Sequence, residues 1–124
     1  MARPKIKRKG VDWKQLLGEE KGFLKNAIQV SPRSFQAYNI LGRAYLGMRR
    51  YDDALRIYEQ AVPFASAGDR KQLGGAFGFA GVGDGFVTAG RMRDAVRAYE
   101  RALLLDPANS DVPKKLAAAR ARIG

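Results

Sequence analysis

Apolar residues recur at helical spacing near both ends of the chain. From Asp12 onward, apolar residues recur at helical intervals until Ser31-Pro32 ends the pattern. The residues are Trp13, Leu16, Leu17, Phe23, Leu24, Ala27 and Ile28. A second stripe consists of Leu116, Ala117, Ala119 and Ile123. The spacing therefore predicts an N-terminal helix over residues 11–31 and a C-terminal capping helix over residues 110–124.

Between these segments one pattern of aromatic and small residues occurs twice. The first copy reads Tyr38-x2-Leu41-Gly42-x2-Tyr45, then Ala54-x3-Tyr58 and Ala61. The second reads Phe79-x2-Val82-Gly83-x2-Phe86, then Ala95-x3-Tyr99 and Ala102, and ends with Asp106-Pro107. In both copies the first alanine stands nine positions after the second aromatic residue. Self-similarity of this kind indicates a repeat architecture.

These residues resemble the tetratricopeptide repeat, a helix-turn-helix unit of about 34 residues. The resemblance covers residues 34–109 and implies an all-α fold, a short right-handed α-solenoid of about six antiparallel helices. Two departures stand out, since Ser66 takes the place of the usual Pro and the copies are 41 residues apart. We expect repeat one over residues 34–67 and repeat two over residues 69–109, in a helical domain that spans residues 11–124.

The longer period places about seven extra residues between Pro63 and Gly75. Seven residues make almost two turns of an α-helix, and Asp69 followed by Gln72 resembles a capping box. We therefore predict that the first helix of repeat two is extended and begins near Arg70. A disordered loop over residues 65–75 is the alternative.

The amino-acid composition limits the kinds of catalysis and ligand binding that the chain can support. The 124 residues include neither Cys nor His, so thiolates and imidazoles are excluded as nucleophiles, bases or metal ligands. The glycine-rich run over residues 74–85 contains no nucleotide-binding motif, so helix packing explains it better than phosphate binding. Since glycine in a helix is unfavourable, either this helix is the loosest element or a partner approaches its backbone. We expect no catalysis and no cofactor.

The resemblance also implies that the inner face of the first helices forms a groove for a partner peptide. The repeat register assigns to this face Gln36, Asn39, Arg43, Leu46, Phe77, Ala80, Asp84 and Thr88, with Lys114 and Lys115 from the cap. Three of the ten are cations, which favours a partner with acidic residues. The first hypothesis is therefore a non-catalytic protein-interaction module or scaffold.

The charge of the chain supports a second hypothesis. Lys and Arg number 23 against 12 Asp and Glu, a net charge of +11. Residues 1–10 form a predicted flexible arm with five cations and no acid, namely Arg3, Lys5, Lys7, Arg8 and Lys9. Such an arm suits a nucleic-acid- or ribosome-associated protein whose repeats hold a protein partner.

The sequence also leads to expectations about the cellular compartment and the oligomeric state. No apolar run approaches the length of a membrane span, so we expect no membrane partner and a cytoplasmic protein. The basic arm resembles a nuclear address signal, which would apply in a eukaryote. Two repeats are fewer than the three usually needed for stability, so either the flanking helices or a second copy of the chain supports them.

The second hypothesis predicts a change in the salt dependence of binding. If the arm binds duplex nucleic acid, each phosphate contact steepens the fall of log affinity with log salt by about 0.9. Deleting residues 1–10 should then flatten that slope by several units in a filter-binding titration. Failure of the full chain to bind RNA or DNA even at low salt would leave the arm without this role.

Overall fold

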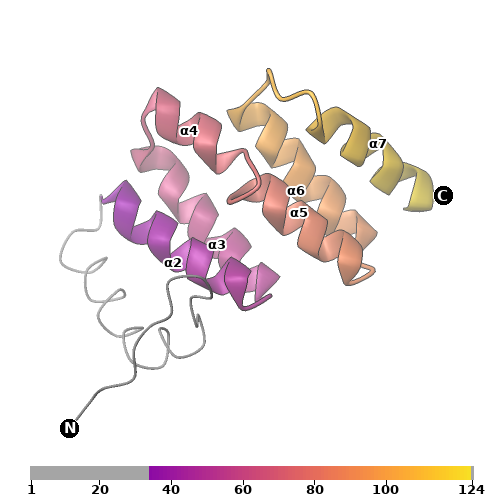
Figure 1. Cartoon of the computed structure of the whole chain (residues 1–124), viewed down its shortest axis with the longest axis horizontal. Helices are drawn as coiled ribbons and strands as arrows, with labels where there is room; N and C mark the ends of the chain where they lie inside the picture. Colours follow the sequence, from indigo (N-terminus) through magenta and orange to yellow (C-terminus); the bar gives the residue numbers. More distant parts are fainter. Residues whose placement is uncertain (1–33, 124) are drawn as a thin grey trace, which may run out of the picture.

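The computed structural model describes residues 34–123, and every regular element in that range is helical (Figure 1). The helices are α2 (Phe35–Gly47), α3 (Tyr51–Ala61), α4 (Ala67–Leu73), α5 (Phe79–Thr88), α6 (Met92–Leu105) and α7 (Val112–Ile123), with a 3₁₀ turn at Val62–Phe64. The all-α solenoid expected from the repeat pattern is confirmed. The predicted arm (1–10) and N-terminal helix (11–31) lie outside the described residues.

The helices stack as pairs in chain order. Helix α2 packs on α3, α5 packs on α6, and α7 covers the free side of α6, while α3 and α5 join the two pairs (Figure 1). The core between them consists mainly of the aromatic and small residues of the repeated pattern. Ala54 and Ala95 have no exposed surface, which allows the paired helices to approach closely.

One glycine in each pair makes room for a tyrosine ring. A Cβ added to Gly42 would overlap the ring of Tyr58, and one added to Gly83 would overlap the ring of Tyr99. Both tyrosines are buried. The two contacts occupy equivalent places in the two repeats, so the repeated Gly-to-Tyr spacing encodes the same packing twice.

The junction between the repeats combines aromatic packing with ion pairs. Tyr51 of α3 lies edge-on to Phe86 of α5, with ring centroids 5.9 Å apart. Arg91 donates from two nitrogens to Asp52 at 2.7 and 3.0 Å, and this hydrogen bonding lowers the pKa of the carboxyl. The pair is exposed, so it contributes little to stability.

The expected long helix at the start of repeat two is absent. Helix α4 ends at Leu73, and α5 begins only at Phe79. The capping box also lies three residues earlier than predicted, because Ser66 caps α4 and exchanges hydrogen bonds with Asp69. The prediction of an extended helix starting near Arg70 is therefore wrong, and the alternative of a loop over residues 65–75 is also wrong for the part that forms α4.

Close packing explains why the helix breaks after Leu73. Gly74 lies against α6, where an added Cβ would stand 2.8 Å from the carbonyl oxygen of Ala102. At Gly78 an added Cβ would overlap the carbonyl group of Leu73, so the backbone turns back on itself there. Glycines 74 and 78 thus permit a turn tight enough to separate two helices, where the length of the insertion and the capping pattern had predicted one.

The turns that end α2 and α5 provide a first prediction on stability. Arg49 adopts a left-handed conformation with φ 64°, and the equivalent Gly90 has φ 80°. Both turns close with the same hydrogen bond, Arg50 N to Tyr45 O and Arg91 N to Phe86 O. The left-handed conformation costs a residue with a side chain about 1 to 2 kcal/mol. Arg49→Gly should therefore raise the free energy of unfolding by about 1 kcal/mol.

Gly90→Ala is the matched control, because nothing lies within 4 Å of an added Cβ there and the change is purely one of backbone strain. We expect it to lower the free energy of unfolding by a similar amount in urea titrations followed by circular dichroism. A loss of stability in Arg49→Gly would show that the arginine side chain contributes more than its backbone costs.

The glycine contacts provide a second prediction. Gly42→Ala and Gly83→Ala should both destabilise the protein, because overpacking costs about 1 to 3 kcal/mol and outweighs the better helix propensity of alanine. Gly68→Ala in α4 meets nothing within 4 Å and should instead stabilise it by about 0.4 to 1 kcal/mol. Thermal unfolding of the three variants would reveal a wrong helix register if all three changed in the same direction.

Candidate functional site

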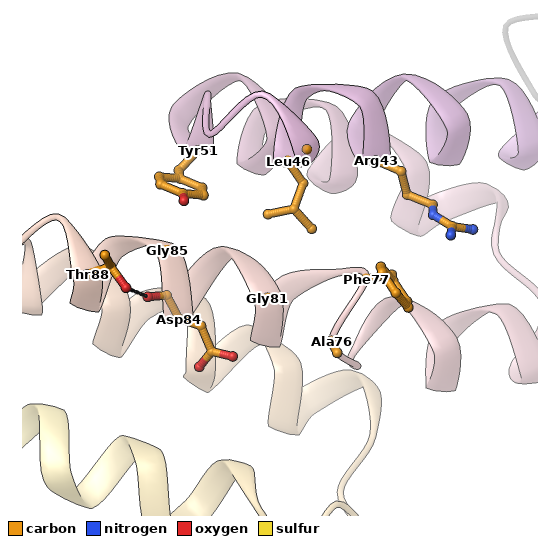
Figure 2. A pocket seen from close by; sticks show the side chains of 10 residues that line it. Arg43, Leu46, Tyr51, Ala76, Phe77, Gly81, Asp84, Gly85 and Thr88 are labelled. Carbon is orange, nitrogen blue, oxygen red and sulfur yellow. Dashed lines mark hydrogen bonds between the residues drawn. The ribbon is translucent and has the colours of Figure 1, made fainter. Parts of the chain in front are cut away.

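Two hollows lie on either side of α5, one toward α2 and the other toward α7. The first has a volume of about 360 Å³ and lies between α2 and α5 (Figure 2). It is lined by Arg43, Leu46, Gly47, Tyr51, Ala76, Phe77, Gly81, Asp84, Gly85 and Thr88. The second, of about 340 Å³, is lined by Asp84, Val87, Thr88, Met92, Tyr99, Lys115, Ala118, Ala119 and Arg122. Because Asp84 and Thr88 line both, the hollows adjoin across α5.

Glycines on α5 let the surrounding side chains come close to its backbone. A Cβ added to Gly81 would lie 3.2 Å from Cδ2 of Leu46, and one added to Gly85 would overlap the ring of Tyr51. Figure 2 shows Leu46 and Tyr51 on the side of the hollow opposite these two glycines. Side chains of the chain itself therefore approach the backbone of α5 at these two glycines, where either a loose helix or an approaching partner was expected.

Phe77 and Arg43 form a stacked pair at one end of the first hollow. The guanidinium carbon of Arg43 lies 4.8 Å from the centroid of the Phe77 ring. The main chain at Phe77 is held as well, because the hydroxyl of Tyr58 donates to its carbonyl oxygen at 2.9 Å. Burial raises the pKa of that tyrosine, so it remains a neutral donor. The Phe77 side chain is nevertheless 61% exposed.

Asp84 stands between the two hollows and is fully engaged. Its carboxylate accepts hydrogen bonds from the Tyr99 hydroxyl at 2.6 Å and from Nζ of Lys115 at 3.0 Å. Burial, followed by the bond to Asp84, raises the pKa of Tyr99. Thr88 donates to the carbonyl oxygen of Asp84 at 3.1 Å (Figure 2). The charge of Asp84 is thus balanced by Lys115.

Most of the residues assigned to the groove from the repeat register line these hollows. They are Arg43, Leu46, Phe77, Asp84, Thr88 and Lys115. Gln36, Asn39 and Lys114 lie outside the two linings, with Gln36 and Lys114 exposed and Asn39 half-buried. Ala80 was placed wrongly, because only 5% of it is exposed and it belongs to the core, next to Phe79, which packs on Tyr58.

Sequence reasoning missed several lining residues. Tyr51 begins α3, whereas the register considered only the first helix of each repeat, so it was left out. Arg122 is near the end of α7, and its recurrence one turn beyond Ala118 and Ala119 is the signal that would have found it. The arm cations Arg3, Lys5, Lys7, Arg8 and Lys9 lie outside the described residues.

The part of the chain that the structure describes, residues 34–123, contains neither a candidate membrane span nor a candidate metal site. In that part no helix combines the length and the apolar character that crossing a bilayer requires. The same residues contain no cluster of three acidic side chains able to hold a metal ion. The lining of the two hollows is mostly apolar and aromatic, with the cations Arg43, Lys115 and Arg122 and the acid Asp84.

Comparison with known proteins identifies the repeat and the fold. Residues 37–73 match the family model described as tetratricopeptide repeat. Twenty-seven chains of solved structures match, among them one titled MamA MSR-1 C2, which is 19% identical with a TM-score of 0.56. That match covers 87% of this chain but only 58% of the other, so at this identity it concerns the fold alone. No curated protein matches the chain.

Proposed function

Because residues 37–73 match the tetratricopeptide-repeat family, we propose that the chain is a non-catalytic interaction module that binds a peptide segment of a protein partner. The peptide would lie across α5 and occupy both hollows. The observation that carries this proposal is that the two hollows share Asp84 and Thr88, so they form one continuous surface.

The lining of the hollows favours a peptide ligand. Leu46, Tyr51 and Phe77 offer apolar surface in the first hollow, while the second contains Val87 and Met92. Binding sites for peptides and small molecules are mostly apolar with a few placed polar groups, and these hollows follow that composition. Catalysis has less support, since Asp84 is held in an ion pair and the chain has no histidine or cysteine.

The charges indicate an acidic peptide. Arg43 lies in the first hollow, and Lys115 and Arg122 lie in the second. Asp84 is the one acid among the lining residues of the two hollows, and Lys115 already compensates it. The surface therefore keeps a positive excess that attracts carboxylates and accelerates their association.

Selection from a library of random peptides displayed on phage tests the proposal. The full chain should enrich peptides with more Asp and Glu than the input library, and Arg43→Glu combined with Lys115→Glu should abolish that enrichment. The reason is that two of the three cations that line the hollows become acids and repel the peptides. Affinities of selected peptides are measured by fluorescence anisotropy.

The control is Lys71→Glu combined with Arg97→Glu, which changes the net charge equally at exposed positions outside both hollows. It should leave the enrichment in place. If both double variants reduced binding alike, the overall charge and not the groove would select the peptides. If the full chain enriched no peptides at all, the groove would not be a peptide site.

A second function is proposed for the arm. Five cations without an acid in residues 1–10, within a chain of net charge +11, favour binding to the phosphates of a nucleic acid or a ribosome. The two functions are compatible, because the arm and the groove are different parts of the chain.

A further inference from the structure

The turn between α4 and α5 presents an aromatic ring to solvent at the edge of the first hollow. Large apolar side chains are usually buried, yet Phe77 is 61% exposed while its neighbour Phe79 is fully buried. The core is complete without the Phe77 ring, since Phe79 occupies the aromatic position of the repeat pattern. The ring therefore has no packing role in the core.

The ring is nevertheless held in a fixed place. Its main chain is anchored by the hydrogen bond from Tyr58, and its face is covered by the guanidinium of Arg43. The turn that carries it is ordered by its own bonds, from the amides of Gly78 and Gly81 to the carbonyl of Gly75 at 3.0 and 3.3 Å. An exposed ring that is already ordered loses little conformational entropy when a ligand binds.

The hollow beside this ring suits a flat aromatic side chain. Its apolar walls are Phe77, Leu46 and Tyr51, and on its α5 side Leu46 and Tyr51 lie directly against Gly81 and Gly85 (Figure 2). Aromatic rings pack favourably in offset or edge-on arrangements with other rings, and the hollow offers two. A volume of about 360 Å³ accommodates such a side chain with part of its backbone.

Arg43 supplies a polar partner next to the hollow. Among residues 34–123 no carboxylate forms an ion pair with it, whereas Arg50, Arg91 and Arg101 are all paired. Stacking on Phe77 covers the face of the guanidinium and leaves its in-plane N–H groups for hydrogen bonds. A carboxylate is the group that such a planar donor binds best, through two parallel bonds.

We propose that the first hollow receives an aromatic side chain of the partner peptide and that Arg43 binds a carboxylate adjacent to it. The ligand class is thus a segment in which Phe, Tyr or Trp stands next to Asp or Glu. This inference rests on the proposed function, because it specifies the peptide that the groove selects. The insertion that forms α4 and the turn after it creates the specificity, since it delivers Phe77.

The phage selection described above also tests this inference, through the sequence motifs of the enriched peptides. Peptides enriched by the full chain should carry an aromatic residue within about one or two positions of an acid. Phe77→Ala should weaken these peptides by about tenfold or more, as truncation of an interface hot spot does. Arg43→Gln should keep the aromatic preference and lose the acidic one.

Folding is not at risk in these variants. Phe77→Ala retains the carbonyl that accepts from Tyr58 and removes only an exposed ring. Leu104→Ala is the matched control for loss of an exposed apolar side chain, because Leu104 is 69% exposed and lies outside both hollows. Arg97→Gln is the control for loss of an exposed arginine. Both controls should bind the selected peptides like the unaltered chain.

The outcomes separate this inference from the proposed function. Enriched peptides that depend on Arg43 and Lys115 but contain no aromatic residue, or that bind Phe77→Ala unchanged, would overturn the aromatic site and leave the peptide groove standing. Enrichment of aliphatic or basic peptides would overturn it as well. Absence of any enriched peptide would overturn both.

Discussion

The contact between a glycine and a tyrosine within each helix pair is the interaction on which the rest of the structure depends. Gly42 with Tyr58, and Gly83 with Tyr99, bring the two helices of each repeat together around a buried ring. The hydroxyl of each ring then donates a hydrogen bond to a residue that lines the groove. Tyr58 donates to the carbonyl oxygen of Phe77, and Tyr99 donates to the carboxylate of Asp84. One buried ring per repeat therefore both closes the core and positions a residue of the groove.

The 41-residue spacing of the repeats leaves room for an additional helix, α4, and for the turn that follows it. Helix α4 is capped at Ser66 and ends where Gly74 touches α6, so the insertion folds against the second helix of repeat two. The chain must then return to the start of α5, and the return passes the first hollow with Phe77 exposed. An insertion that a shorter repeat would lack thus furnishes one wall of the candidate site.

The repeat pattern predicted the helix pairs because period and residue size are local properties of the chain. It placed Ala54 and Ala95 at close contacts, and it placed Arg43, Leu46 and Asp84 on one face. The break between α4 and α5 escaped prediction because it depends on the proximity of Gly74 to α6, a tertiary contact that the length of the insertion and its capping pattern do not contain. Tyr51 was missed for a similar reason, since its ring reaches the hollow only when α3 packs beside α5.

The groove is positively charged because most acidic side chains of the described residues form ion pairs outside it. Acidic side chains of the described residues pair with cations of neighbouring turns and helices, and these acids include Asp52, Asp53, Glu59, Asp94 and Glu100, none of which lines the two hollows. Such exposed pairs add little stability individually. Their carboxylates are neutralised outside the two hollows, so they do not offset the charges of Arg43, Lys115 and Arg122. Asp84 is the exception, and its bond to Lys115 requires an acidic ligand to compete for that lysine, which favours recognition through Arg43.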